Sequence, residues 1–205
     1  MSFARKSPGT VVPYDTTTAR WKARAWAMVT YLFVLAAVAG IVLFAVRYQP
    51  LSTANFASGA VTESGSNMVR VEYTNGGTFS FGFLLVNDGP VPMKIQRIQM
   101  TGQDELLVPL KIETAAKRDA GTLAEGDPSL DKFLPFTLSG DDRRWIVIRT
   151  SFGNCGRFAA GAFETYTRVQ VTYSVLAFTR HVWVPLPKDI RVDSPPDYAC
   201  PARAA

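Results

Sequence analysis

The chain has 205 residues, of which 47% are hydrophobic and 19% are charged. This size and composition fit one compact domain of roughly 150 residues with an added apolar segment. The net charge is +5, but the segment before Tyr48 holds six basic residues and one acid, whereas the remainder has 16 of each sign. The basic excess is therefore confined to one end, which argues against a basic face that binds nucleic acid.

An uncharged segment of 21 residues runs from Trp26 to Val46, without Pro, Asn, Gln or His. As a helix with a rise of about 1.5 Å per residue it would span about 31 Å, which matches the ~30 Å hydrocarbon core of a bilayer. We predict one transmembrane helix over residues 26–46, anchored by Trp26 and Val46 at its ends. A cleaved signal peptide is the alternative, but its apolar core would be shorter and small residues would mark a cleavage site, which Arg47–Pro50 lacks.

The flanking charges predict how this helix is oriented. Arg20, Lys22 and Arg24 lie directly before it, and only Arg47 follows it closely. Short segments rich in Lys and Arg remain on the cytoplasmic side of a membrane. We therefore expect residues 1–25 to form a cytoplasmic basic tail. The chain would then be a single-pass protein of the plasma (inner) membrane with an extracytoplasmic C-terminal part.

Two small residues of the apolar segment, Ala36 and Gly40, are four positions apart. This spacing lets two membrane helices approach closely, so pairing with itself or with a partner helix is one interpretation. The other is that Ala and Gly are simply common in membrane helices.

Residues 47–67 are rich in Ser, Thr, Ala and Gly, and we predict that they form a tether that lifts a folded domain of residues 68–205 off the membrane. Within that domain, eight segments alternate apolar and polar residues, which is typical of strands with one buried face. The predicted strands are residues 68–73, 79–85, 93–100, 108–112, 133–138, 144–150, 168–175 and 182–186.

Local signals refine this strand pattern. Asn75-Gly76 predicts a hairpin, and Phe178-Thr179 a tight turn. The third strand changes phase near Gln96 and Arg97, which requires a bulge or kink. Pro109 predicts that the fourth strand lies at an edge. The predicted core joins the face of Phe79, Phe81 and Phe83 to that of Val169, Val171, Tyr173 and Val175.

These features predict an all-β fold: an Ig-like antiparallel β-sandwich of about eight strands after a single N-terminal transmembrane helix. Cys155 and Cys200 are the two cysteines. Outside the cytoplasm such a pair is more often a disulfide than two free thiols, and closing a loop of about 45 residues would add ~4 kcal/mol of stability. Metal or thiol-redox chemistry is the alternative, but the chain has neither a CxxC pair nor a Cys/His cluster.

Four stretches carry a resemblance to known sequences. They are Phe81–Ile98, Phe152-Gly153-Asn154-Cys155, Arg168–Pro187 and Cys200-Pro201. Together they resemble bacterial membrane-anchored proteins with an Ig-like outer domain, over about two thirds of the chain. The shared motifs are structural, and the resemblance implies no activity.

A polar segment from Glu113 to Lys132 interrupts the strand pattern. A connection of this length in a compact domain is usually functional, disordered or partly helical, so we predict an interaction loop. Glu125, Asp127 and Asp131, with Asp119, are an alternative Ca²⁺ site, although their spacing does not match an EF-hand loop. A solvated polar loop is the third interpretation. The candidate loop residues are Lys117, Arg118, Asp119, Glu125, Asp127 and Asp131.

The sequence contains little that predicts catalysis. A Ser-His-Asp or Cys-His site would need His181, the single histidine, which the strand pattern places on the outer face beside Trp183. A glycine-rich phosphate loop is absent. We therefore expect no enzyme activity, no cofactor and no bound metal.

The prediction for function is a non-enzymatic, membrane-anchored interaction or accessory module of the cell envelope, whose partners are the lipid bilayer and another membrane or envelope protein. The alternative is a sensory domain that binds a small ligand or metal ion. A hydrolase that uses His181 or a carboxylate is the third hypothesis.

Overall fold

The computed structural model describes residues 16–59, 61–100, 106–115, 130–153, 156 and 159–195. The chain divides into two compact units, Met1–Tyr48 and Gln49–Ala205. The first contains helix α1, Thr16–Arg47, and the second contains the strands. The predicted cytoplasmic tail is described only from Thr16, where it already belongs to the helix.

Helix α1 contains a 21-residue stretch, Arg24–Phe44, that is long and apolar enough to cross a membrane. The described side chains of this stretch are exposed on every side of the helix. A helix that is apolar all round is stable in lipid or in a protein core, and here protein covers none of the stretch. The hydroxyl of Thr30 donates to the carbonyl of Trp26 at 2.9 Å, so this polar group has its hydrogen-bond partner within the helix.

The first sheet is antiparallel throughout and has the order β1-β4-β9-β6-β7. Its strands are β1 (Leu51–Ser58), β4 (Thr78–Asn87), β6 (Leu107–Ala115), β7 (Asp131–Lys132) and β9 (Arg143–Phe152).

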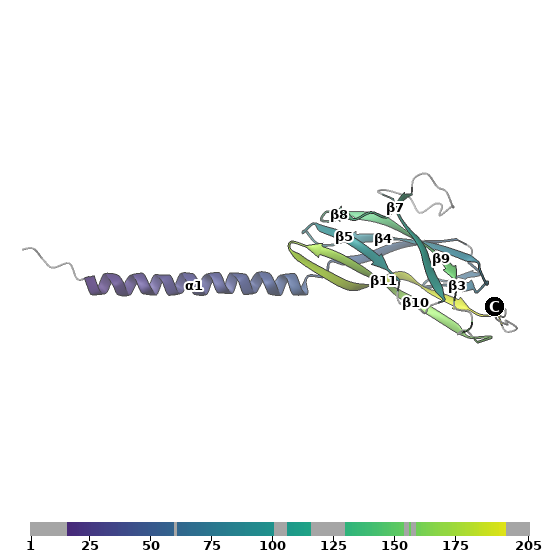
Figure 1. Ribbon diagram of the computed structural model, residues 1–205, viewed down its shortest axis with the longest axis horizontal. Helices are drawn as coiled ribbons and strands as arrows, with labels where there is room; N and C mark the ends of the chain where they lie inside the picture. The colour runs from purple at the N-terminus through teal and green to yellow at the C-terminus, as the bar shows by residue number, and fades with distance from the viewer. Residues whose placement is uncertain are drawn as a thin grey trace, which may run out of the picture. The chain divides into compact units, whose positions relative to one another are not determined.

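The second sheet has the order β2-β3-β11-β10-β5-β8. Its strands are β2 (Glu63–Ser64), β3 (Met68–Glu72), β5 (Met93–Gln99), β8 (Phe136–Leu138), β10 (Phe163–Val175) and β11 (Phe178–Asp193). The pair β3 and β11 is parallel, whereas the predicted sandwich was antiparallel. The two sheets form the two layers of a sandwich (Figure 1).

The core lies between the sheets and confirms the predicted faces. Phe79, Phe81 and Phe83 of β4 are buried, with neighbouring ring centroids 5.8 and 6.5 Å apart. The inward side chains of β10 are buried as well; they are Val169, Val171, Tyr173 and Val175. Burying each such side chain stabilises the fold by about 1.5–3 kcal/mol, and other strands add further buried apolar residues to this core.

Two predicted irregularities are confirmed. Along β10, Thr172 pairs with Arg97 and Tyr173 pairs with Ile95, so Gln96 is the extra residue of a bulge. Pro109 lies on a part of β6 that pairs with β9 on one side and with no described strand on the other. Proline lacks the N–H that a strand on that side would require.

The predicted tether is wrong for residues 51–58, which form β1 and pair with β4 from Leu51↔Asn87 to Ser58↔Phe81. The segment lacks apolar alternation because it is an edge strand whose side chains are half-buried on both faces. Asn55 has a φ of 43° at the shift of register, a conformation that Asn tolerates better than most residues.

Other corrections concern turns and strand number. The turn at Asn75-Gly76 is present, but it links β3 of one sheet to β4 of the other and closes no hairpin. The last hairpin turns at Leu176-Ala177, before the predicted Phe178-Thr179, because Val175 pairs with Phe178. The eight predicted strands correspond to β3, β4, β5, β6, β8, β9, β10 and β11, and the structure adds β1, β2 and β7.

Candidate interaction site

Two strand edges remain uncovered on the same side of the sandwich. β8 pairs with β5 only at Met93–Ile95, and β7 pairs with β6 only at Glu113 and Thr114. No described strand covers the outer edge of β5 beyond Ile95 or that of β6 from Val108 to Lys111, whereas the amide of Leu107 donates to the hydroxyl of Tyr166 at 3.0 Å. Uncovered strand edges present backbone N–H and C=O groups that can pair with another chain.

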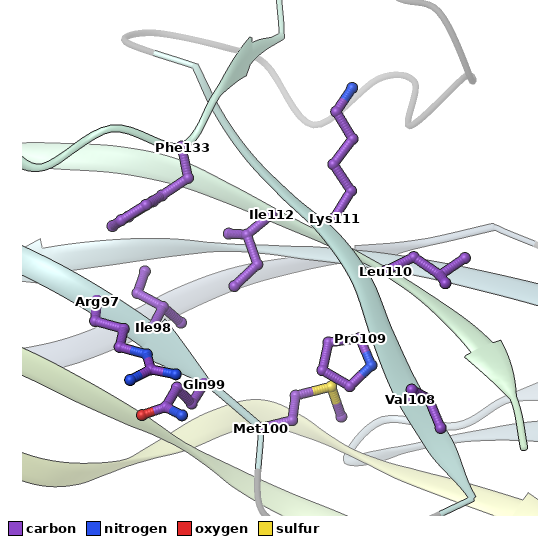
Figure 2. Close-up of a pocket in the computed structure, with 10 residues that line it drawn as sticks. All are labelled: Arg97, Ile98, Gln99, Met100, Val108, Pro109, Leu110, Lys111, Ile112 and Phe133. Atoms are coloured by element: carbon purple, nitrogen blue, oxygen red, sulfur yellow. The ribbon is translucent and has the colours of Figure 1, made fainter. Parts of the chain in front are cut away.

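A groove of about 690 Å³ lies between these two edges. Figure 2 shows side chains of β5 and of Met100, which follows it, on one side and side chains of β6 on the other, with Phe133 at one end. The lining residues are Arg97, Ile98, Gln99, Met100, Val108, Pro109, Leu110, Lys111, Ile112 and Phe133. We call this feature the edge groove.

The edge groove is apolar inside and polar at its border. Ile98 and Met100 are buried, while Leu110 on the opposite strand is 60% exposed. Arg97 and Lys111 are exposed cations, and Gln99 adds an amide. An apolar floor with a few polar groups is the usual composition of a protein's binding cleft.

Glu113 is a buried carboxylate directly after the groove-lining part of β6. It accepts a hydrogen bond from Arg149 Nε at 2.6 Å and forms an ion pair with Lys111 Nζ at 2.5 Å. Burial raises the pKa of the Glu113 carboxyl, but the hydrogen bonds from Lys111 and Arg149 and their charges lower it, and the net pKa lies below the ordinary value. Glu113 thereby neutralises the charge of Lys111 beside the groove.

The groove ends where β6 becomes covered. The carbonyl of Ile112 accepts a hydrogen bond from the amide of Phe133 at 3.0 Å, and Glu113 then pairs with Lys132. The ring of Phe133 lies 5.9 Å from that of Phe136, in an edge-on arrangement. This contact holds Phe133 as a wall of the groove.

Most residues of the predicted interaction loop and both cysteines lie outside the described residues. Only Asp131 is described: it is exposed in β7 and pairs with Thr114. The remaining ones are Lys117, Arg118, Asp119, Glu125, Asp127, Cys155 and Cys200. The interaction loop and the disulfide therefore stay predictions.

The described part of the chain holds no group of three or more His, Cys, Asp or Glu residues that could bind a metal ion. His181 is exposed, as the strand pattern predicted, and its Nδ1 lies 2.9 Å from the hydroxyl of Thr172 on the neighbouring strand. Trp183, also exposed, stacks under the guanidinium of Arg168 at 5.1 Å.

The predicted anchor residues all lie in α1. Trp26, Ala36 and Gly40 are exposed, and a Cβ placed on Gly40 would meet nothing within 4 Å. This open surface would admit a second helix, and the pairing stays a prediction. Val46 and the residues predicted to set the topology belong to the same helix; those residues are Arg20, Lys22 and Arg24.

The edge groove itself was not predicted. One sequence signal pointed to it, the edge proline Pro109, since proline is tolerated where a strand has no neighbour on its N–H side. The sequence could not show that β5 and β6, which belong to different sheets, lie on the two sides of one groove.

No protein-family model and no curated protein matches the chain. Among solved structures, it is similar to a protein from Corynebacterium diphtheriae described as membrane anchored, with 10% identity and a TM-score of 0.41 over 78% of this chain and 38% of that one. It is also similar to a GH20 exo-β-N-acetylglucosaminidase from Vibrio harveyi, with 10% identity and a TM-score of 0.34 over 76% of this chain and 20% of that one.

A third similar structure is a PapD-like domain of human CEP192, with 10% identity and a TM-score of 0.31 over 74% of this chain and 87% of that one. The chain spans well under half the length of the first two proteins, at 38% and 20%. At these identities and TM-scores, no activity, partner or family membership follows from the similarity.

Proposed function

We propose that this protein is a non-enzymatic interaction module of the cell envelope, anchored by α1 and presenting an Ig-like sandwich outside the inner membrane. The length and composition of α1 support the anchor. The basic residues before the span support the orientation, because positively charged flanks stay in the cytoplasm.

The edge groove is the observation that carries the interaction role. Its two strand edges offer backbone hydrogen bonds, and its floor offers apolar surface to an extended segment of a partner. The described residues give Arg97 no hydrogen bond or ion pair, whereas Lys111 is paired with Glu113. The preferred occupant is therefore an extended, largely apolar segment of a membrane or envelope protein, with a carboxylate opposite Arg97.

Site-specific photo-crosslinking in intact cells tests this proposal. A photo-reactive residue in place of Leu110 should give a defined adduct with one envelope protein. Substituting Arg97→Glu in the same chain should abolish that adduct, because the groove then repels the partner's carboxylate. The adduct is read by mass spectrometry.

Two controls make the experiment decisive. Lys94→Glu makes the same charge change on the same strand but outside the groove lining, and it should leave the adduct intact. A photo-reactive residue in place of Trp183, exposed on β11 and separated from β5 by β10, should not give the adduct. Equal adducts from both positions, or equal loss with both charge reversals, would refute the groove as the binding site.

A further inference from the structure

The turn between β10 and β11 exposes two large apolar side chains. Val175 and Phe178 form the last pair of this hairpin, and Leu176-Ala177 is its two-residue turn. Leu176 is 67% exposed and Phe178 is 38% exposed. We call residues 175–178 the hairpin tip.

Leu176 also has an unfavourable backbone conformation. Its φ is 54°, in the left-handed region that two-residue hairpin turns usually fill with Gly or Asn. A leucine there costs conformational energy and leaves apolar surface in water. With two thirds of its surface exposed, the side chain of Leu176 gains little from burial within the domain to offset these costs, and such a residue at a loop tip suits a role outside the fold.

The hairpin tip lies at the end of the sandwich where the chain enters the domain. Val175 pairs with Met93, which follows directly after the turn between β4 and β5. In that turn the amide of Asp88 donates to the carbonyl of Pro50 at 2.9 Å. The tip, this turn and Pro50 therefore share one end of the domain, which we call the entry end.

The chain between the predicted span and the entry end is short. The apolar stretch of α1 ends at Phe44, and the amide of Tyr48 still bonds to the carbonyl of Phe44 at 2.8 Å, as in a helix. Six residues reach at most about 20 Å, and the polar headgroup layer is itself about 5–8 Å thick. The entry end is thus held within reach of the bilayer surface.

We propose that the hairpin tip inserts into the headgroup region of the membrane in which α1 is anchored, as a second lipid contact of the domain. The inference depends on the proposed membrane anchor. Exposed charges at the entry end have both signs, with Asp141 and Asp142 followed by Arg143. The contact is therefore apolar, and it does not require anionic lipid.

Lipid photo-crosslinking of the full chain tests the proposal. p-Benzoylphenylalanine replaces either Phe178 or Phe163, and the protein is reconstituted in phosphatidylcholine vesicles with or without phosphatidylglycerol. Phe163 is a matched control, because it is 57% exposed and begins β10, the 13-residue strand that ends beside the tip. That strand length places it about 40 Å away.

Position 178 should give a lipid adduct in both kinds of vesicle, and position 163 should give none above background. Leu176→Asn suits the left-handed conformation but removes the apolar side chain, so it should reduce the adduct from position 178 without lowering the melting temperature. Absence of a lipid adduct at position 178, or equal adducts at both positions, would overturn the inference.

Washing the vesicles with alkaline carbonate separates this inference from the anchor. Protein that stays in the membrane but gives no adduct would leave the anchor standing and refute only the lipid contact. Protein that the wash removes would refute both.

Discussion

At the scale of single residues, polar groups buried near the surface of the sandwich define its geometry. Asn87 is fully buried, and the two N–H groups of its side chain are shared among the carbonyls of Val91, Leu138 and Ser139, at N···O distances of 2.9–3.2 Å. Its side-chain oxygen accepts from the amide of Gly89 at 3.1 Å. One side chain thus joins two turns of the entry end. Local sequence cannot show which distant carbonyls this side chain bonds.

Glu113 is the residue whose ionisation should matter for stability. Its folded-state pKa is lowered from the ordinary 4.5. A lowered pKa means that the carboxylate stabilises the fold above its unfolded pKa, and that this stabilisation is lost as the pH falls through the folded-state value. The affected range therefore begins near pH 4.5 and extends downward.

Glu113→Gln should lower the free energy of unfolding at pH 7 by about 2 kcal/mol, since it removes the charge of the carboxylate that Arg149 hydrogen-bonds. It should also flatten the loss of stability below about pH 5. Urea unfolding at several pH values measures both effects. Glu72→Gln, at an exposed carboxyl on β3, is the control. An unchanged pH profile in Glu113→Gln would contradict the assignment.

At the scale of elements, β1 shows how far a strand can depart from a recognisable pattern. Its sequence, LSTANFAS, is small and polar because the strand lies at a sheet edge with half-buried side chains. The hydroxyl of Thr53 donates to the carbonyl of Pro185 on β11, at 2.5 Å, so the strand also bridges the two sheets. Neither role requires apolar alternation, the signal by which strands are detected.

Phe56 tests whether β1 is part of the domain. Its ring stacks with that of Phe81, with centroids 6.2 Å apart. Because the side chain is half-buried, Phe56→Ala should cost about 2 kcal/mol of unfolding free energy, roughly half the value for a fully buried phenylalanine. Denaturant unfolding measures it. Val61→Ala, at an exposed residue beyond β1, should change the free energy little. A flexible tether would give equally small effects at both positions.

The open edges of β5 and β6 are a second feature at the scale of elements. Each strand was recognisable from its apolar residues, but only β6 carried a mark of its open edge, at Pro109. Local sequence cannot tell which two edges adjoin, because that depends on strand order in two sheets and on how the sheets pack. The edge groove is a product of topology.

At the scale of the whole molecule, the asymmetry of charge makes a prediction about topology. Arg20, Lys22 and Arg24 precede the span, and the chain beyond Tyr48 is neutral overall. A reporter phosphatase that is active only outside the cytoplasm should therefore be active when fused to the C-terminus.

Replacing those three residues by Gln removes the charge bias nearest the span and should lower phosphatase activity. The same three substitutions placed in the polar segment 113–132, at Lys117, Arg118 and Lys132, should not. An inactive fusion of the unmodified chain would contradict the proposed orientation, and with it the prediction of a Cys155–Cys200 disulfide.

By itself, the sequence determined the apolar span and the sandwich class, because both follow from local composition and period: an uncharged run long enough for a bilayer, and two-residue alternation along strands. Tertiary structure alone decided that residues 51–58 join a sheet, that the Asn75-Gly76 turn crosses between sheets and that β3 lies parallel to β11. These features depend on backbone hydrogen bonds between segments that are distant in the sequence. Every residue except proline has the same backbone donor and acceptor, so the identity of the side chains does not specify which segments pair.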